Sequence, residues 1–333
     1  MTDASHSRHL VAPELLAALE RLPQLELDDA LLAFIRTLPP GANGMTMPER
    51  TPEQDAVRCE ERFAPGLDGA PDVRLLVYTP PGARSLRPAY LHLHGGGFVM
   101  GSPEISDGAN RDLALAQDSI VVSVDYRLAP ETRWTGSYDD VDAALAWLHR
   151  EADPLGIDRT RIAVGGESAG GGHAAALALR ARDRGDYPLC LQLLDCPMLD
   201  DRTCVSADPH PFAGEFVWTP ASNRFGWRAL LGQEPGGDDI PAAAVPARAA
   251  DLAGLPPTFI AIGALDLFLE ENLDYARRLT RAGVPVELHV IPGAFHGYAM
   301  AGAAAPQISA VTRYRSDALA RAFAPRRQGE TDG

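Results

Sequence analysis

The chain contains no lysine, so all 30 of its basic residues are arginines. This absence excludes two classes of covalent chemistry, because serine–lysine hydrolases and Schiff-base enzymes both depend on a lysine amine. A nucleotide-binding loop of the G-x-x-x-x-G-K-[ST] type is excluded for the same reason. Any nucleophilic chemistry in this chain must therefore be activated by other side chains.

Cysteine is also scarce, with four residues in a chain of 333. They are Cys59, Cys190, Cys196 and Cys204. No two of them form a C-x-x-C pair, and none has the spacing of a zinc site or a disulfide scaffold. No dinucleotide fingerprint follows the first predicted strand. We therefore expect free, buried thiols and a protein that uses no metal and no cofactor.

Long apolar runs are missing too. No run reaches the roughly 18 residues that a membrane span requires, and no basic segment followed by an apolar stretch opens the sequence. The net charge is -15, from 30 basic and 45 acidic residues. This charge disfavours binding to nucleic acid or to an anionic membrane surface. Together these features predict a cytoplasmic protein whose partner is a small molecule.

Short apolar segments rich in β-branched residues recur along the chain, and helical patterns separate several of them. The predicted strands cover residues 73–78, 90–94, 120–124, 161–165, 189–194, 258–264 and 286–291. The predicted helices among them cover residues 107–117, 138–152, 169–184, 270–282 and 307–323. This alternation is typical of an α/β fold in which helices cover both faces of a mostly parallel sheet.

Two segments stand apart from this alternation. Between residues 12 and 38, leucine and alanine recur at helical spacing, and a loop rich in proline and glycine follows at residues 39–44. We interpret residues 1–47 as the N-terminal part of a helical cap on a main domain at residues 48–333. Residues 209–252 hold two tryptophans and many prolines and glycines. They predict an insertion over the carboxyl edge of the sheet, where open α/β sheets bind ligands.

A predicted strand-to-helix junction carries the motif Gly-Glu-Ser-Ala-Gly at residues 166–170. In a G-x-S-x-G turn the serine stands on a sharp, strained bend, so the residues two before and two after it must be small. The helix begins at the serine, and its N-terminus favours negative charge that develops there. Ser168 is therefore the candidate nucleophile. The alternative interpretation is a glycine-rich turn without a catalytic role.

A second glycine-rich segment, His-Gly-Gly-Gly-Phe at residues 94–98, follows another predicted strand. Consecutive glycines after a strand let backbone N–H groups converge on one substrate oxygen, and such an element accompanies the serine turn. We predict that the N–H groups of Gly96, Gly97 and Ala169 form an oxyanion hole. His94 is expected to hold this loop rather than to react.

These two segments, together with Asp-Tyr-Arg-Leu-Ala-Pro-Glu at residues 125–131, resemble the motifs of the hormone-sensitive-lipase-like family of esterases. The similarity in order and spacing runs from about residue 70 to residue 300. Many members of that family carry aspartate where this chain has Glu167, a change that keeps the charge. The resemblance implies an α/β-hydrolase catalytic domain with a helical cap, no cofactor, and hydrolysis of short-acyl carboxylic esters.

The base of a serine triad on this fold comes last in the chain, after the acid. Three histidines lie far enough beyond Ser168: His210 in the insertion, His289 inside a predicted strand, and His296. His296 follows the strand at residues 286–291 on a loop next to glycine, from which it can reach the active site. The catalytic histidine of the family stands in a similar segment, and we predict His296 as the base.

The acid should follow the carboxyl end of a strand. Asp266 comes directly after the predicted strand at residues 258–264, and the family segment is similar here. Glu270 and Glu271 are alternatives, but they open a predicted helix, where acidic side chains interact with the helix dipole. We predict Asp266 as the acid that orients the histidine.

The surroundings of the triad are less sharply indicated. Phe98, Glu167, Phe212 and Trp218 are candidates for substrate binding, although single aromatic residues more often serve packing. The strand at residues 286–291 is expected to be the last of the sheet, and an open edge predicts a homodimer. The leading functional hypothesis is a serine carboxylesterase. A hydrolase of amides or lactones with the same triad, or a ligand-binding protein without activity, remains as an alternative.

Overall fold

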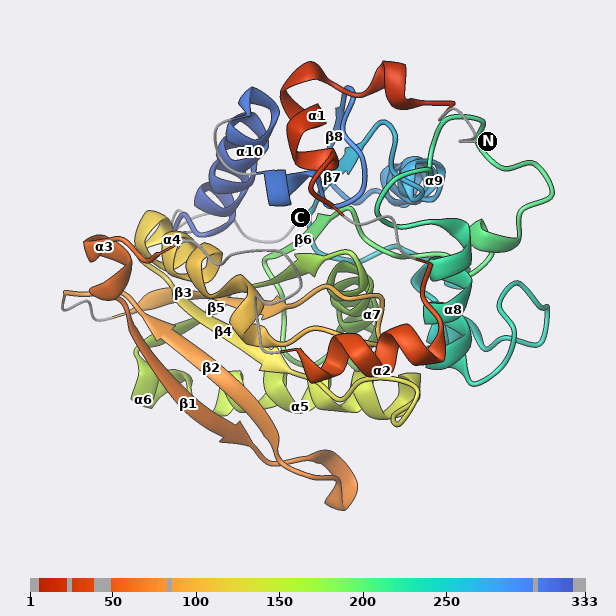
Figure 1. Ribbon diagram of the computed structural model, residues 1–333. Coiled ribbons are helices and arrows are strands. Elements are labelled where there is room, and N and C mark those ends of the chain that lie inside the picture. Colours follow the sequence, from red (N-terminus) through yellow and green to blue (C-terminus); the bar gives the residue numbers. More distant parts are fainter. Residues whose placement is uncertain (1–5, 23–25, 39–48, 83–85, 302–304, 326–333) are drawn as a thin grey trace.

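The computed structural model describes residues 6–22, 26–38, 49–82, 86–301 and 305–325 (Figure 1). The strands of these residues form an eight-stranded sheet in the order β1-β2-β4-β3-β5-β6-β7-β8. The strands are β1 (Arg58–Ala64), β2 (Val73–Thr79), β3 (Arg87–Leu93), β4 (Ile120–Asp125), β5 (Ile157–Glu167), β6 (Leu191–Asp195), β7 (Thr258–Gly263) and β8 (Val286–Ile291). β1 pairs antiparallel with β2 and β2 antiparallel with β4, whereas all other pairs are parallel. The predicted α/β fold is confirmed.

β1 is the strand that the sequence did not indicate. Most of its residues are exposed or half-buried, because it forms one edge of the sheet. An edge strand of this kind lacks the apolar signature that marks β3, whose seven residues are all buried. Central parallel strands read as continuous apolar segments because both of their faces are covered.

Helices cover the two faces of the sheet (Figure 1). One face packs against α5, α7 and α9, and the other packs against α4, α10 and the N-terminal α1. The helices are α1 (Pro13–Leu19), α2 (Asp29–Thr37), α3 (Pro52–Asp55), α4 (Asp107–Gln117), α5 (Trp134–Arg150), α6 (Ala152–Leu155), α7 (Ala169–Arg184), α8 (Pro220–Leu231), α9 (Leu269–Arg281) and α10 (Pro306–Ala322). Side chains alternate accordingly along a strand: Leu75 and Val77 join the first core, and Leu76 and Tyr78 the second.

A third apolar cluster lies above the carboxyl ends of the parallel strands. It joins α2, α8 and the glycine-rich segment after β3, with Leu32, Phe98, Trp218 and Trp227 among its buried members. The insertion thus contains a helix, α8, which the sequence does not indicate because the segment is rich in proline and glycine. The predicted loop at residues 39–44 lies outside the described residues.

The N-terminal segment is tied to the insertion at two points. The Leu27 N–H donates to Ser222 Oγ of α8 at 3.1 Å, and the Ser7 N–H donates to the Glu215 carboxylate at 2.8 Å. We call residues 6–22 and 26–38, together with residues 209–252, the roof. Within the described part of the chain, no helix combines the length and the apolar character needed to cross a membrane.

Candidate active site

The Ser168 turn is built as the motif predicts. β5 ends at Glu167 and α7 begins at Ala169, and between them Ser168 has φ 55° and ψ -119°. A non-glycine residue in this region is strained by about 1 to 3 kcal/mol, so surrounding contacts must hold it there. The Ser168 N–H donates to the Asp195 carbonyl at 2.9 Å, and the Ser168 carbonyl accepts from the Met198 N–H at 3.0 Å. The turn is therefore fixed on both sides by the chain that leaves β6.

Ser168, His296 and Asp266 form a continuous hydrogen-bonded row. Ser168 Oγ lies 3.0 Å from His296 Nε2, and His296 Nδ1 lies 2.8 Å from Asp266 Oδ2. The other carboxylate oxygen of Asp266 accepts from the Phe268 N–H at 2.9 Å. Asp266 is fully buried, whereas Ser168 and His296 are 8% and 6% exposed. This arrangement can transfer a proton from the hydroxyl to the imidazole while the carboxylate holds the ring.

The other candidates for acid and base lie elsewhere. His289 bonds to Glu287 at 2.8 Å and stacks on Tyr314, away from Ser168. His210 contacts Phe212 on the insertion. Glu271 turns toward the segment after β6, where it accepts hydrogen bonds from the backbone.

Close backbone packing explains the small residues of the serine turn. A Cβ atom on Gly170 would stand 1.9 Å from the Leu93 carbonyl oxygen and 2.6 Å from that of His94. α7 can therefore approach the end of β3 only because position 170 has no side chain. This approach brings the N-terminus of α7 next to the glycine-rich segment.

These two segments carry the three backbone N–H groups that are predicted to bind an oxyanion. Among the described residues, the N–H groups of Gly96, Gly97 and Ala169 have no hydrogen-bond acceptor within the protein. Gly97 has φ 59°, and a Cβ there would stand 2.1 Å from the Trp218 ring. Position 97 thus combines a left-handed backbone with direct packing of an aromatic ring. Such free N–H groups can stabilise an oxyanion.

Two buried histidines support the backbone of the Ser168 turn and of the glycine-rich segment, which we call the floor of the site. His94 stacks on Tyr126 with ring centroids 4.3 Å apart, and His173 stacks on the other side of Tyr126 at 4.4 Å. Burial lowers the pKa of His94 to about 4 and that of His173 to about 3. Both imidazoles are therefore neutral at physiological pH. The Tyr126 hydroxyl donates to the His94 carbonyl at 2.6 Å and fixes the start of the glycine-rich segment.

The four residues expected to bind substrate have different surroundings. Trp218 packs on Gly97, and its ring centroid lies 6.3 Å from that of His296. Phe98 is 1% exposed and packs between His173 and Trp227, in the core.

The other two lie away from the reacting atoms. The Glu167 carboxylate bonds to His92 Nε2 at 3.1 Å, beneath the turn. Phe212 is 41% exposed and contacts His9 and His210. The structure brings only Trp218 of the four next to His296.

Arg36 makes contacts that no sequence pattern indicates. Its guanidinium donates to the Val99 carbonyl at 2.7 and 2.9 Å and to the Ala129 carbonyl at 2.6 Å, and it pairs with Glu131 at 2.7 Å. Helix α2 is thereby joined to the glycine-rich segment and to the segment at residues 125–131. The partners are 63 to 95 residues away in sequence, so local spacing carries no signal for them.

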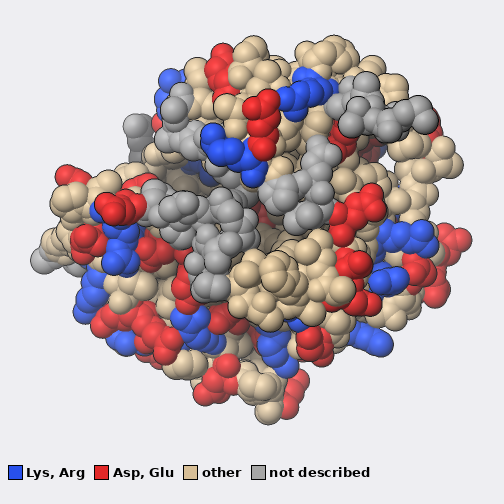
Figure 2. All heavy atoms as spheres, in the orientation of Figure 1, with Lys and Arg blue, Asp and Glu red and all other residues tan. Residues whose placement is uncertain are grey.

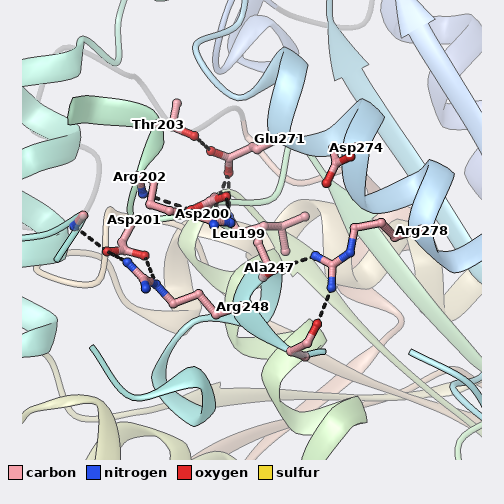
Figure 3. Close-up of polar contacts among 12 residues, drawn as sticks. Leu199, Asp200, Asp201, Arg202, Thr203, Ala247, Arg248, Glu271, Asp274 and Arg278 are labelled. Carbon is pink, nitrogen blue, oxygen red and sulfur yellow. Dashed lines mark hydrogen bonds and ion pairs between the residues drawn. The ribbon is translucent and has the colours of Figure 1, made fainter. Parts of the chain in front are cut away.

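The segment after β6 is held by a network of polar contacts (Figure 3). Glu271 accepts from the Leu199 N–H at 2.6 Å and from the Thr203 hydroxyl, and Arg248 pairs with buried Asp201 at 2.7 Å. A surface groove of about 540 Å³ borders this network and includes Arg248 but not the triad in its lining. The network therefore supports the backbone behind Ser168 rather than forming part of the reaction centre.

Comparison with known proteins identifies the family. A family model described as alpha/beta hydrolase fold matches residues 90–300. The carboxylesterase NlhH of Mycobacterium tuberculosis is 40% identical over 284 residues, which cover 84% of this chain and 86% of the relative. The esterase LipI of the same species is 34% identical over 323 residues, covering 90% and 91%. The chain belongs to the hormone-sensitive-lipase-like family of α/β-hydrolase esterases.

A solved structure of this family extends the comparison to three dimensions. The bacterial heroin esterase has a TM-score of 0.86 and 39% identity, with 95% of this chain and 99% of that chain covered. The family match begins at residue 90 and therefore contains the glycine-rich segment and all three residues of the hydrogen-bonded row. The structural match also extends over most of the roof.

Figure 2 shows that the face carrying α2 and α8 presents acidic and basic side chains in a mixed pattern.

Proposed function

We propose that this chain is a serine carboxylesterase that hydrolyses short-acyl carboxylic esters. The observation that carries the proposal is the row Ser168–His296–Asp266, with hydrogen bonds of 3.0 and 2.8 Å, beside free backbone N–H groups. Membership of an esterase family supports ester hydrolysis as the reaction class. The triad assignment and the acyl-chain preference belong to the proposal.

The proposed reaction uses these side chains and N–H groups in two similar cycles. His296 Nε2 accepts the Ser168 proton as Oγ attacks the ester carbonyl, and Asp266 keeps the Nδ1 proton in place and stabilises the imidazolium. The N–H groups of Gly96, Gly97 and Ala169 bind the developing oxyanion. His296 then donates its proton to the leaving alcohol, and water attacks the acyl-enzyme in a second, similar cycle.

The roof is the basis for the acyl-chain assignment. Trp218 packs on Gly97 and lies near His296, and Arg36 holds α2 over the same segment. A roof this close to Ser168 favours acyl chains of roughly C2 to C8 and excludes water from the acyl-enzyme. We assign residues 1–47 and 209–252 to this cap and residues 48–333 to the α/β-hydrolase catalytic domain.

A panel of p-nitrophenyl esters from acetate to palmitate tests the substrate class. We expect kcat/KM to fall steeply for long chains, with no rise in rate when the substrate passes its solubility limit. Fluorophosphonate labelling followed by peptide mass spectrometry should find Ser168 as the modified residue, and Ser168→Ala should lose labelling and activity together. Full activity of Ser168→Ala would refute the triad, and preference for insoluble triglycerides would refute the chain-length assignment.

The same triad could also cleave amides or lactones, since leaving-group preference depends on pocket shape. Matched anilide and lactone substrates in the same panel separate these reactions from ester hydrolysis. A ligand-binding protein without activity would show no turnover of any of them. The ester is favoured because the relatives are named as esterases.

We further propose that the chain forms homodimers through β8. This strand is an edge of the sheet, and its Val290 is 41% exposed. An open edge pairs readily with another strand. Light scattering should give about twice the chain mass of 35.6 kDa, whereas a monomer at micromolar concentration would contradict the proposal.

A further inference from the structure

A thiol lies directly behind the catalytic row and has no part in the proposed reaction. Cys196 follows β6 and is 6% exposed. Its backbone has φ 38°, and its N–H donates to the Ala261 carbonyl at 2.7 Å. The residue before it, Asp195, accepts from the Ser168 N–H at 2.9 Å. The thiol is therefore next to both the nucleophile and the histidine loop.

Cys196 is close enough to two members of the row to share a ligand with them. Its Sγ, a carboxylate oxygen of Asp266 and a ring nitrogen of His296 all lie within 4.8 Å of one another, and all three residues are buried. The ring nitrogen that faces Asp266 is Nδ1, at 2.8 Å from Oδ2. Zn²⁺ prefers donor atoms of these three kinds, with bonds of about 2.0 to 2.3 Å. Donor atoms bound at these lengths to one tetrahedral ion stand roughly 3.3 to 3.8 Å apart, which is inside this 4.8 Å limit.

The surroundings favour a cation at this position. The carboxylates of Asp266 and Glu167 lie near the thiol and attract a divalent ion, and coordination removes the penalty of an isolated buried thiolate. The segment is also held in place, because the Pro197 carbonyl accepts from Asn272 Nδ2 at 3.0 Å and Leu199 N–H donates to Glu271.

We propose that Cys196, Asp266 and His296 form an inhibitory site for a thiophilic divalent cation such as Zn²⁺ or Cd²⁺. On binding, the thiol proton leaves to solvent and the imidazole proton moves from Nδ1 to Nε2 by exchange with solvent. The Nδ1 lone pair then coordinates the metal ion. Because Nε2 now carries a proton, it cannot accept the proton of Ser168. The inhibitory part of this proposal rests on the catalytic roles proposed above, whereas the binding part does not.

Inhibition by ZnCl₂ tests the site in the full-length enzyme. The rate of each variant is measured relative to its own rate in EDTA, so that differences in basal activity cancel. Loss of one ligand should raise the half-inhibitory ZnCl₂ concentration by at least about tenfold in Cys196→Ser. Cys204→Ser is the matched control, because Cys204 lies in the same segment but contacts the Asp201 carbonyl instead of the row. It should be inhibited like the unaltered protein, and excess EDTA should restore activity.

A spectroscopic measurement separates metal binding from catalysis. Titration with CdCl₂ should produce the ultraviolet charge-transfer band of a Cd²⁺–thiolate bond in the unaltered protein and in Ser168→Ala. The band should be absent in Cys196→Ser. If Ser168→Ala shows the band but Ser168 proves not to be the nucleophile, the metal site stands and the proposed function fails. Equal ZnCl₂ inhibition in the unaltered protein and Cys196→Ser, or a Cd²⁺ band that survives the loss of Cys196, would overturn the site.

Discussion

The floor of the active site and its roof are held by different kinds of contact. The floor is backbone against backbone: α7 reaches the end of β3 at Gly170, and Ser168 keeps its strained turn through bonds to Asp195 and Met198. The roof rests more on side chains, chiefly Trp218 on Gly97 and Arg36 on two carbonyl oxygens. It also has a few backbone contacts, such as Gly226 of α8 against the Gly97 carbonyl and the Ala12 N–H to the Gly293 carbonyl. Backbone contacts of this closeness allow one residue type at each position, whereas side-chain contacts can be replaced or repacked.

This difference has a functional meaning. The chemistry of an acyl-enzyme requires fixed positions, because a displacement of about 1 Å at the reacting atoms can reduce the rate about a hundredfold. Substrate selection requires only a surface of suitable shape. A family can therefore keep its floor and vary its roof to accept different esters. Substitutions in the two regions should accordingly differ in size and in the kinetic constant that they change.

Gly170→Ala, a substitution in the floor, should have the largest effect. The added Cβ would stand 1.9 Å from the Leu93 carbonyl oxygen, in a place where neither backbone can yield cheaply. We expect a loss of at least about 3 kcal/mol in the free energy of unfolding and a decrease in kcat of at least about a hundredfold. Urea denaturation and ester kinetics measure the two effects.

Gly108→Ala is the matched control for that substitution. Gly108 lies in α4, and a Cβ there would meet only the Gln54 side chain, at 3.8 Å. Its kcat and stability should be unchanged or slightly improved, since alanine is the better helix former. If Gly170→Ala resembled Gly108→Ala, the floor would be far more adaptable than its packing indicates.

Acid should destabilise the floor through its buried histidines. The pKa values of His94 and His173 are lowered to about 4 and about 3, from about 6.5 in the unfolded chain. Between the lowered pKa of each folded histidine and about pH 6.5, the unfolded state binds more protons than the folded state. The free energy of unfolding therefore falls as the pH decreases from about 6.5. At pH 5 each histidine should account for about 2 kcal/mol of this loss.

His173→Gln isolates one of these contributions. Glutamine does not titrate in this range, and its amide can still donate to the Ala169 carbonyl that His173 contacts at 3.1 Å. The loss of stability between pH 7.5 and pH 5, measured by urea denaturation at both values, should be smaller by about 2 kcal/mol in the variant. An identical loss in both proteins would mean that His173 is not kept neutral by its surroundings.

The motifs of the floor can be read from the sequence, whereas most contacts of the roof cannot, for a physical reason. Ser168, Gly97 and His296 lie in short segments whose local geometry demands particular residues, so the motifs are visible within a few positions. Arg36 and Trp218 make contacts over long sequence distances, and neither contact requires a local pattern. Phe98 shows the same limit: it follows the glycine-rich segment and was a candidate for substrate contact, but tertiary packing turns its ring into the core.

Strands and helices follow the same division. β3 and the other central strands are largely buried and mostly apolar, so the sequence indicates them, whereas β1 is an exposed edge that the sequence does not indicate. Helix α8 lies in a segment interrupted by prolines and glycines, and its buried side faces the roof cluster instead of the sheet. A strand that is buried on both faces can therefore be recognised from its sequence. An element whose burial depends on which distant segment covers it cannot.

Arg36→Ala, a substitution in the roof, should have the smallest effect and should act mainly on substrate binding. It removes charge-assisted bonds to Val99 and Ala129 but leaves the Ser168–His296 and His296–Asp266 contacts untouched. The side chain is 27% exposed, so we expect a stability loss of only about 1 to 2 kcal/mol. KM for butyrate esters should rise roughly 3- to 10-fold with kcat nearly unchanged, because uniform binding is lost.

Two further variants sharpen this prediction. Arg36→Lys should recover little, since an ammonium lacks the planar fork that bridges two carbonyl oxygens. Arg224→Ala, which breaks an exposed pair with Glu234 on the same roof, is the control and should change neither constant. A fall in kcat as large as that of Gly170→Ala would show that the roof positions the glycine-rich segment, and the division between floor and roof would then fail.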